Sequence, residues 1–297
     1  MRPAGATCSP PSSRMPELAI CGSISADYIG YGPHLPRAGE TVLGDRLLIA
    51  PGGKGANVAV AAARLGARVR FHGARGDDAN GELIGRALAA EGIDVSALRV
   101  LPDVASGVAL ICVDERAENQ ILTLPGANGR VGPPAPCGAR VWFCPGEIPR
   151  AAHVGTLAAA RADRAIAIVN PSPANAFDPE LLPLFDIAIV NEGELQAFAE
   201  SLPERVIVTR GRSGAVVLPD GPEFAAHPAI AVDTTGAGDA FAGGICAGLT
   251  EGLTLDDAIR LALVTAALSV EREGCQPSYP TRAEVDRRNG LNDVSRS

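Results

Sequence analysis

Short apolar runs alternate with alanine-rich stretches along most of the chain. Residues 18–22 and 187–190 are apolar runs of strand length, whereas residues 57–65 and 237–250 have the length and composition of helices. Gly66 directly follows the first of these helices, which is a typical helix end. Strands that alternate with helices in this way predict a parallel sheet that is covered by helices on both faces.

The same criteria predict the remaining elements of this main sheet and of its helical layers. Further strands are predicted at 69–73, 141–144, 165–169, 206–209 and 215–218, and further helices at 81–91, 151–162, 193–200, 255–271 and 281–288.

Four apolar stretches within residues 27–50 and 105–125 have no full-length helix between them, and they predict a small separate β-sheet that projects from the main domain. The predicted fold class is therefore α/β, with a three-layer α/β/α domain over residues 17–290. The four stretches are 27–32, 41–50, 107–113 and 119–124, and a charged turn joins the last two as a hairpin.

Residues 1–16 are rich in proline and serine and are expected to form a flexible tail without the apolar segment of a secretory signal. No apolar run approaches the roughly 20 residues that span a bilayer, so no membrane contact is expected. The net charge of −8 argues against nucleic acid as a partner. Seven cysteines and four histidines show no zinc-site spacing, which indicates a reduced, cytoplasmic protein.

The chain contains 25 arginines but a single lysine, Lys54, in the glycine-rich segment 51–57. A compact ammonium fits among close-packed glycines where a planar guanidinium fits less well. Chance placement is the alternative interpretation, since one lysine must stand somewhere. The unusual neighbours of Lys54 favour a functional role.

A second glycine-rich segment, residues 233–244, follows a strand-like stretch and opens a predicted helix. Small residues at 235–238 leave successive backbone N–H groups free at the positive end of that helix, which forms an anion site. Asp239 in the first turn can accept a proton from an attacking hydroxyl. The alternative is that Asp239 only caps the helix.

Three further polar positions lie at predicted strand ends or helix starts, and each has a structural alternative. Asp27 follows the first strand, at the sheet edge where α/β proteins bind ligands, or it is a turn residue. Asn57 can bond ligand hydroxyls or cap its helix. Asn191 and Glu194 follow another strand at the same edge, although most glutamates in such positions are solvated.

These segments resemble the signatures of the ribokinase (PfkB) family of sugar kinases. The first signature is matched by residues 52–66 with 76–81, and the second by residues 233–244. The resemblance covers residues 17–288. It also includes 22–27, 36–41, 126–128, 170–173, 191–194 and 274–278 in family order.

The resemblance implies an ATP-dependent kinase that phosphorylates the primary hydroxyl of D-ribose. Asp239 is then the catalytic base, and the N–H groups of Gly236, Ala237 and Gly238 form the anion hole. The sugar hydroxyls are then held by Asp27, Gly53, Lys54, Asn57 and Glu147.

The resemblance also implies two kinds of cation and a nucleotide site. Asn191 and Glu194 position Mg²⁺ and the phosphates, while Thr209, Gly211 and Gly238 lie along ATP. Family members use a monovalent cation, usually K⁺. Its ligands here are expected from Asp233, Thr235, Ser269, Arg272, Gly274 and Ser278.

In the family the small sheet acts as a lid over the sugar and can pair two subunits, so a homodimer is expected. The family usually has asparagine where this chain has Ser25, and the segment before residue 206 is short. A kinase for another sugar or for a nucleoside is therefore the alternative within this chemistry. A catalytically inactive sugar or nucleotide sensor is the alternative outside it.

Overall fold

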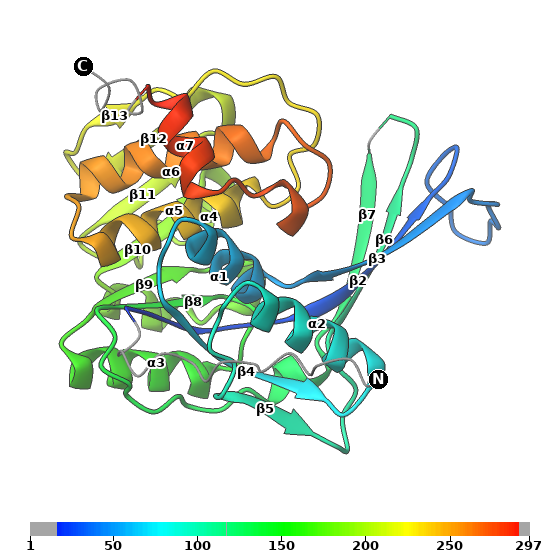
Figure 1. The fold of residues 1–297 in the computed structure, drawn as a ribbon, viewed down its shortest axis with the longest axis horizontal. Coiled ribbons are helices and arrows are strands. Elements are labelled where there is room, and N and C mark those ends of the chain that lie inside the picture. The colour runs from blue at the N-terminus through cyan, green and yellow to red at the C-terminus, as the bar shows by residue number, and fades with distance from the viewer. Residues whose placement is uncertain (1–16, 117, 291–297) are drawn as a thin grey trace, which may run out of the picture.

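The computed structural model describes residues 17–116 and 118–290, which form a three-layer α/β/α domain with a small projecting sheet (Figure 1). The main sheet of the described residues has nine strands in the order β13-β12-β11-β10-β9-β8-β1-β4-β5. Their bounds are β1 Leu18–Cys21, β4 Val69–Gly76, β5 Leu98–Leu101, β8 Val141–Pro145, β9 Ile166–Asn170, β10 Ile187–Asn191, β11 Val206–Thr209, β12 Ala215–Leu218 and β13 Glu223–Phe224.

The seven strands from β5 to β11 pair in parallel, as the strand–helix alternation predicts, whereas β12 and β13 extend the sheet antiparallel. Successive side chains of a strand point to opposite faces of the sheet. Leu18 and Ile20 accordingly belong to one hydrophobic core, and Ala19 and Cys21 belong to the other. Two separate cores therefore lie on the two faces, which fixes the register of the central strands.

Helices from different parts of the chain cover these two faces (Figure 1). The core that contains Leu18 includes residues of five of the described helices, three of which supply most of them, and the core that contains Ala19 includes residues of α3. The three helices are α1 (Lys54–Arg64), α5 (Ala237–Glu251) and α6 (Leu255–Ser269), while the others are α2 (Ala79–Ala90), α3 (Arg150–Asp163), α4 (Glu192–Ala197) and α7 (Arg282–Arg288). None of the helices within the described ranges is long and apolar enough to cross a membrane.

The predicted small sheet is confirmed, with strand order β3-β2-β6-β7. It projects from one side of the domain as two long pairs of strands (Figure 1). The predicted hairpin is also present, since β6 and β7 pair antiparallel. The strands are β2 (Ser25–Tyr31), β3 (Arg46–Gly52), β6 (Val108–Val113) and β7 (Asn119–Leu124).

Several predicted boundaries differ from those of the structure. The strand predicted at 41–50 begins only at Arg46, and the helix predicted at 193–200 ends at Ala197. The helix predicted from Asn57 begins three residues earlier, at Lys54. The sequence pattern missed β5 and β13, because these strands are short and lie at the sheet edges, where apolar patterning is weak. The flexible tail predicted for residues 1–16 lies outside the described residues.

Candidate active site

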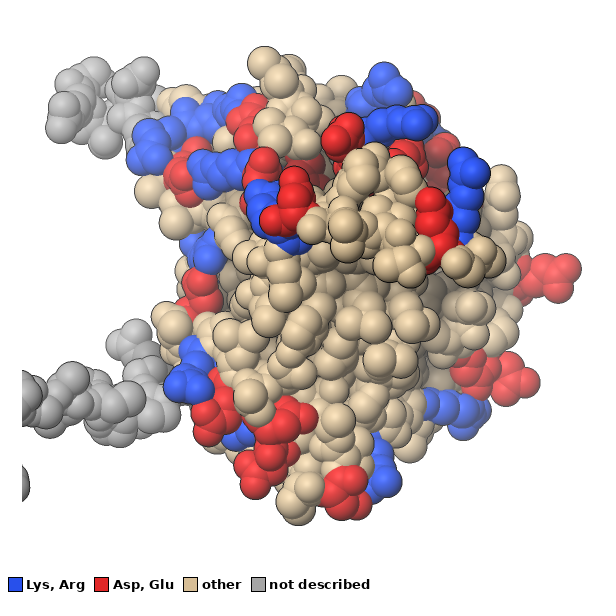
Figure 2. Space-filling model, turned by 90° about the vertical axis from the view of Figure 1, so that its right-hand side faces the viewer, with Lys and Arg blue, Asp and Glu red and all other residues tan. Residues whose placement is uncertain are grey.

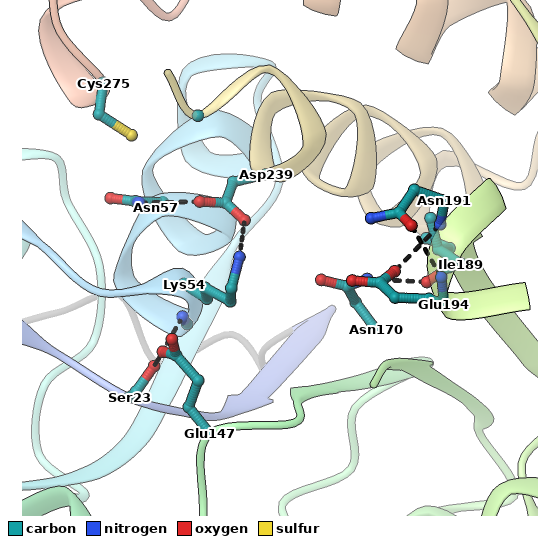
Figure 3. Close-up of polar contacts among 12 residues, drawn as sticks. Ser23, Lys54, Asn57, Glu147, Asn170, Ile189, Asn191, Glu194, Asp239 and Cys275 are labelled. Carbon is teal, nitrogen blue, oxygen red and sulfur yellow. Dashed lines mark hydrogen bonds and ion pairs between the residues drawn. The ribbon is translucent and has the colours of Figure 1, made fainter. Parts of the chain in front are cut away.

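The candidate site lies where the carboxyl ends of the parallel strands meet the N-termini of α1 and α5 (Figure 3). The first turn of α1 packs directly on the chain that leaves β1. A Cβ atom added to Gly22 would stand 2.7 Å from the Cα atom of Gly55, so both positions require glycine for this close approach. Gly53 precedes α1 as its N-cap residue, and its φ of 94° turns the chain from β3 into the helix. Glycine at these positions therefore places Lys54 at the edge of the main sheet.

Asp239 occupies the centre of the site, where it is 7% exposed. Its Oδ2 accepts a hydrogen bond of 2.8 Å from Nδ2 of Asn57, and its Oδ1 lies 4.0 Å from Nζ of Lys54 (Figure 3). The carboxylate of Asp239 bonds Asn57 and not an N–H group of its own helix, so Asp239 is not a side-chain cap of α5. Asn57 lies inside α1 rather than at its start, so the capping alternative for Asn57 is wrong too.

Asp27 lies on β2 and not in a turn, so the turn alternative is wrong. Its Oδ1 accepts a hydrogen bond of 2.6 Å from the hydroxyl of Ser25. A Cβ atom at position 52 would overlap the carboxylate of Asp27, so Gly52 provides the space for it. Burial raises the pKa of Asp27 from 3.8 to about 6, and the negative charges of Glu147 and Asp239 add to this effect.

Glu147 supplies a third carboxylate to the same region. Its Oε2 accepts a hydrogen bond of 2.8 Å from the hydroxyl of Ser23. Burial raises the pKa of Glu147, whereas the ammonium of Lys54 lowers it. The charge of Asp239 raises the pKa of Lys54, although burial works in the opposite direction. One ammonium thus stands among the carboxylates of a polar, partly enclosed site that can bind several hydroxyl groups.

The N-terminus of α5 supplies backbone donors beside Asp239. Gly236 has a φ of 75°, and a Cβ atom there would overlap the thiol of Cys275. The N–H of Ala237 donates to the carbonyl of Thr234 at 3.2 Å. In the described part of the chain, no backbone acceptor is found for the N–H groups of Gly238 and Asp239. The N–H of Gly236 likewise has no acceptor among the described residues, so the free donors of this predicted anion hole are those of Gly236, Gly238 and Asp239, whereas the expected donor Ala237 is already engaged.

Asn191 and Glu194 form a reciprocal cap at the start of α4. The side chain of Asn191 accepts from the N–H of Glu194 at 2.9 Å, and Oε2 of Glu194 accepts from the N–H of Asn191 at 3.0 Å. Glu194 is 8% exposed, so it is not a solvated glutamate. A cavity of about 110 Å³ lies between this pair, Lys54 and Asp239. The pair therefore faces the candidate site while it holds its own helix.

A larger cavity of about 460 Å³ adjoins the smaller one, and both are lined by Thr209 and Gly238. Gly211 lines the larger cavity, as do the apolar side chains of Phe241 and Val270. The structure thus brings the residues expected along the nucleotide to one hollow beside the N-terminus of α5. Its apolar lining suits a planar aromatic ring.

The residues expected to hold a monovalent cation come from two adjacent loops. The carboxylate of Asp233 accepts from the N–H of Thr235 and from the N–H of Gly274, each at 2.9 Å. Burial would raise the pKa of Asp233, but these two hydrogen bonds outweigh it and hold the pKa below its usual value. The hydroxyl of Ser278 donates to the carbonyl of Cys275, and that of Ser269 donates to the carbonyl of Ala266. The side chain of Arg272 bonds Glu284, so only its backbone is available.

Sequence reasoning did not single out three polar residues that belong to this region. Ser23 holds Glu147, and Gln276 donates a hydrogen bond of 3.0 Å to Oδ1 of Asn57. Asn170 lines the smaller cavity and donates to the carbonyl of Ile189 at 2.8 Å. A signal existed for Asn170, because it is a polar residue at the carboxyl end of an apolar strand.

Comparison with known proteins connects this geometry to an enzyme family. The profile of the pfkB family carbohydrate kinases matches residues 15–282. The chain is 34% identical over 295 residues to a ribokinase of Haemophilus influenzae, covering 90% of this chain and 96% of the relative. It is 31% identical over 307 residues to a deoxyribokinase of Salmonella typhi, covering 93% of this chain and 100% of that relative.

Solved structures of similar proteins share the fold. A ribokinase of Arabidopsis thaliana in complex with ribose and ATP has a TM-score of 0.84 at 28% identity, over 93% of this chain and 99% of that one. A nucleoside kinase of Burkholderia thailandensis in complex with inosine has a TM-score of 0.81 at 28% identity, over 93% of this chain and 96% of that one.

Proposed function

The chain belongs to the pfkB family of carbohydrate kinases, and we propose that it transfers the γ-phosphoryl group of ATP to the primary hydroxyl of D-ribose. The products are D-ribose 5-phosphate and ADP. The relatives named ribokinase and the similar structure that contains ribose and ATP support this substrate pair. The whole catalytic domain is assigned to residues 17–290.

The observation that carries the proposal is the position of Asp239, a buried carboxylate at the N-terminus of α5 that Asn57 holds by a hydrogen bond. The sugar oxygen forms a bond to the γ-phosphorus while the bond from that phosphorus to the β-phosphate oxygen breaks. Asp239 accepts the proton of the sugar hydroxyl. The backbone N–H groups of Gly236, Gly238 and Asp239 stabilise the charge that develops on the transferred group.

The sugar is assigned to the polar region between Lys54 and the carboxylates of Asp27 and Glu147. Carboxylates accept hydrogen bonds from sugar hydroxyls, and an ammonium donates to their oxygens. Asn57 and the backbone of Gly53 complete this set. The hydroxyl of Ser25 bonds the carboxylate of Asp27. Because serine is shorter than the asparagine that the family usually has at position 25, it leaves room for a sugar with different substituents.

The nucleotide is assigned to the two adjoining cavities, with its base in the apolar one beside Gly211 and its phosphates toward Gly238 and Thr209. Oxygen ligands suit Mg²⁺. Asn191 and Glu194 offer them at the smaller cavity, directly or through water. The metal neutralises phosphate charge when it is bound.

The loops around Asp233 suit K⁺, because its carboxylate connects two loops that carry backbone carbonyls, while the side chain of Arg272 is held by Glu284. The Asp233 carboxylate already joins the loop at Thr235 to the loop at Gly274. Its expected partners are the Thr235 carbonyl, the backbone at Ser269, Arg272 and Gly274, and the Ser278 hydroxyl. These loops flank Gly236, so a cation between them would hold the anion hole in shape.

The small sheet is assigned the role of a lid that also pairs two copies of the chain. Both β3 and β7 expose large apolar side chains, among them Leu47 at 65% and Ile121 at 57%. Figure 2 shows the side of the molecule from which this sheet projects, and its centre is a broad surface without charged side chains. Exposed apolar surface of this kind marks a contact with another protein surface.

The first experiment is coupled ATP turnover with ribose, 2-deoxyribose, fructose, adenosine and uridine, with and without K⁺. Ribose-dependent turnover that Asp239→Asn reduces by roughly 100-fold or more supports the proposal. Preference for deoxyribose or a nucleoside keeps the mechanism and changes the substrate. Nucleotide binding without turnover on any of these substrates would favour the inactive sensor.

A further inference from the structure

The side chain of Gln276 belongs to a chain of hydrogen bonds that ends on Asp239. Nε2 of Gln276 donates to Oδ1 of Asn57 at 3.0 Å, and Nδ2 of Asn57 donates to Oδ2 of Asp239 at 2.8 Å. The three residues are 5%, 6% and 7% exposed, respectively. Because they are buried, water does not readily replace a lost partner.

The chemistry of Asp239 fixes the direction of both bonds. An ionised carboxylate only accepts hydrogen bonds, so Asn57 has to turn its Nδ2 toward Asp239. The Oδ1 of Asn57 is then directed at Gln276, which has to present its own NH₂ group. An amide rotated by 180° would place Oδ1 against the carboxylate, which is repulsive. The donor from Gln276 therefore selects the amide orientation that is productive for Asp239.

The backbone of Gln276 is also held by α1, the helix that carries Asn57. Nη1 of Arg64 donates to the carbonyl of Gln276 at 2.7 Å and to the carbonyl of Tyr279 at 2.9 Å. Arg64 follows Asn57 by seven residues on α1, so the two side chains lie on one face of that helix. Glu91 fixes the guanidinium through two bonds, at 2.6 and 3.1 Å. The helix α1 thus holds the turn that begins at Gln276 in two places.

We propose that Gln276 is a positioning residue of phosphoryl transfer. It orients the amide of Asn57 so that the N–H group aims the carboxylate of Asp239 at the sugar hydroxyl. This inference rests on the proposed kinase function. Gln276 does not touch the sugar or ATP, and it acts only through Asn57.

A double-mutant cycle tests this dependence. Gln276→Met keeps the length of the side chain but removes the donor, and Asn57→Ala removes the amide. We expect Gln276→Met to lower kcat/KM for the sugar about tenfold or more in the natural chain, and less than twofold in the Asn57→Ala chain. The KM for ATP should stay unchanged. An equal loss in both backgrounds would overturn the proposal, because Gln276 would then act independently of Asn57.

Gln276→Glu is the second variant, because it has the same shape and, when ionised, no donor. Its matched control is Gln196→Glu on α4, which makes the same charge change at an exposed position. We expect the loss of kcat/KM with Gln276→Glu and no loss with Gln196→Glu. Full activity of Gln276→Glu at pH 8 contradicts the proposal. Melting temperatures of all variants show whether each is folded.

A measurement without turnover separates this inference from the proposed function. The side-chain amide signals of Asn57, assigned by their absence in Asn57→Ala, are recorded by ¹⁵N NMR in the sugar-free protein. We expect Gln276→Met to shift these signals and speed their exchange with water, and Gln196→Glu to leave them unchanged. Unchanged signals in Gln276→Met overturn the positioning role even if the enzyme acts on another substrate.

Discussion

The ammonium of Lys54 lies 4.0 Å from Oδ1 of Asp239, across the space between the N-termini of α1 and α5 (Figure 3). Lys54 is the only lysine of the chain. The pair joins the two glycine-rich segments, which are far apart in the sequence. Since the charge of Asp239 raises the pKa of Lys54, the ammonium form is favoured beside the carboxylate.

Replacement of Lys54 tests whether a compact ammonium is needed there. Lys54→Arg keeps the charge but puts a larger planar group in place of the compact ammonium, in a cavity of only about 110 Å³ that Asp239 also lines. We expect kcat/KM for the sugar to fall roughly 10- to 100-fold in Lys54→Arg and at least as far in Lys54→Met. Steady-state kinetics at saturating ATP measure this effect. Activity in Lys54→Arg equal to that of the natural chain would contradict the assigned role.

The raised pKa of Asp27 predicts a pH dependence of sugar binding. Burial is the main reason that this pKa is about 6, and the nearby charges of Glu147 and Asp239 add to it. Below that pH the protonated carboxyl accepts hydroxyl hydrogen bonds less well. We expect the KM for the sugar to rise several-fold as the pH falls from 7 to 5. Asp27→Asn should have a high KM that changes little over the same range, and a flat profile in the natural chain would refute the assignment.

The same shift predicts an effect on the stability of the sugar-free protein. The folded-state pKa of Asp27 is raised, so its stabilising contribution is fully present below about pH 3.8 and is lost as the pH rises through about 6. Asp27→Asn removes the buried charge. At pH 8 we expect this variant to have a free energy of unfolding higher by roughly 2–3 kcal/mol. Urea titrations at pH 8 and pH 4 measure the difference, which should be absent at pH 4.

The exposed apolar side chains of the small sheet predict dimerisation. Leu47→Glu places a charge on β3 at a position that is 65% exposed in one copy of the chain. We expect sedimentation velocity to show a dimer for the natural chain and a monomer for this variant. Leu184→Glu is the matched control, because Leu184 is 52% exposed and lies outside the small sheet. A dimer that survives Leu47→Glu, or a natural chain that is monomeric, would exclude this interface.

The two hydrogen bonds of Asp233 predict a role for it in cation activation. We expect kcat of the natural chain to be several-fold higher with K⁺ than with choline as the replacement cation. Asp233→Asn removes one negative charge from the site while it keeps an acceptor for the N–H of Thr235. This variant should lose most of the K⁺ effect and retain its activity without K⁺. Equal activation by K⁺ in both proteins would show that the cation binds elsewhere.

The strand–helix alternation, the separate small sheet and the two glycine-rich segments can be predicted from local sequence patterns, without the tertiary structure. Each of these features depends on residues that are close together in the sequence. The apolar runs 141–144 and 206–209 specify buried strands, and the glycines around Lys54 and Asp239 allow tight turns at helix starts. Local patterns of this kind do not depend on the rest of the chain. They also carried the resemblance to the sugar kinases.

Which polar groups meet in the site depends on how distant segments of the chain pack together. Asn57 and Asp239 are 182 residues apart, and Gln276 lies 219 residues from Asn57, so no local pattern shows that they form one chain of hydrogen bonds. From sequence, Asn57 could equally cap its helix. In the structure, Gly53 with its positive φ lets the helix begin at Lys54, so that Asn57 lies within the helix and its side chain bonds Asp239 on α5. Contacts between distant segments follow from strand order and helix packing, which periodicity does not encode.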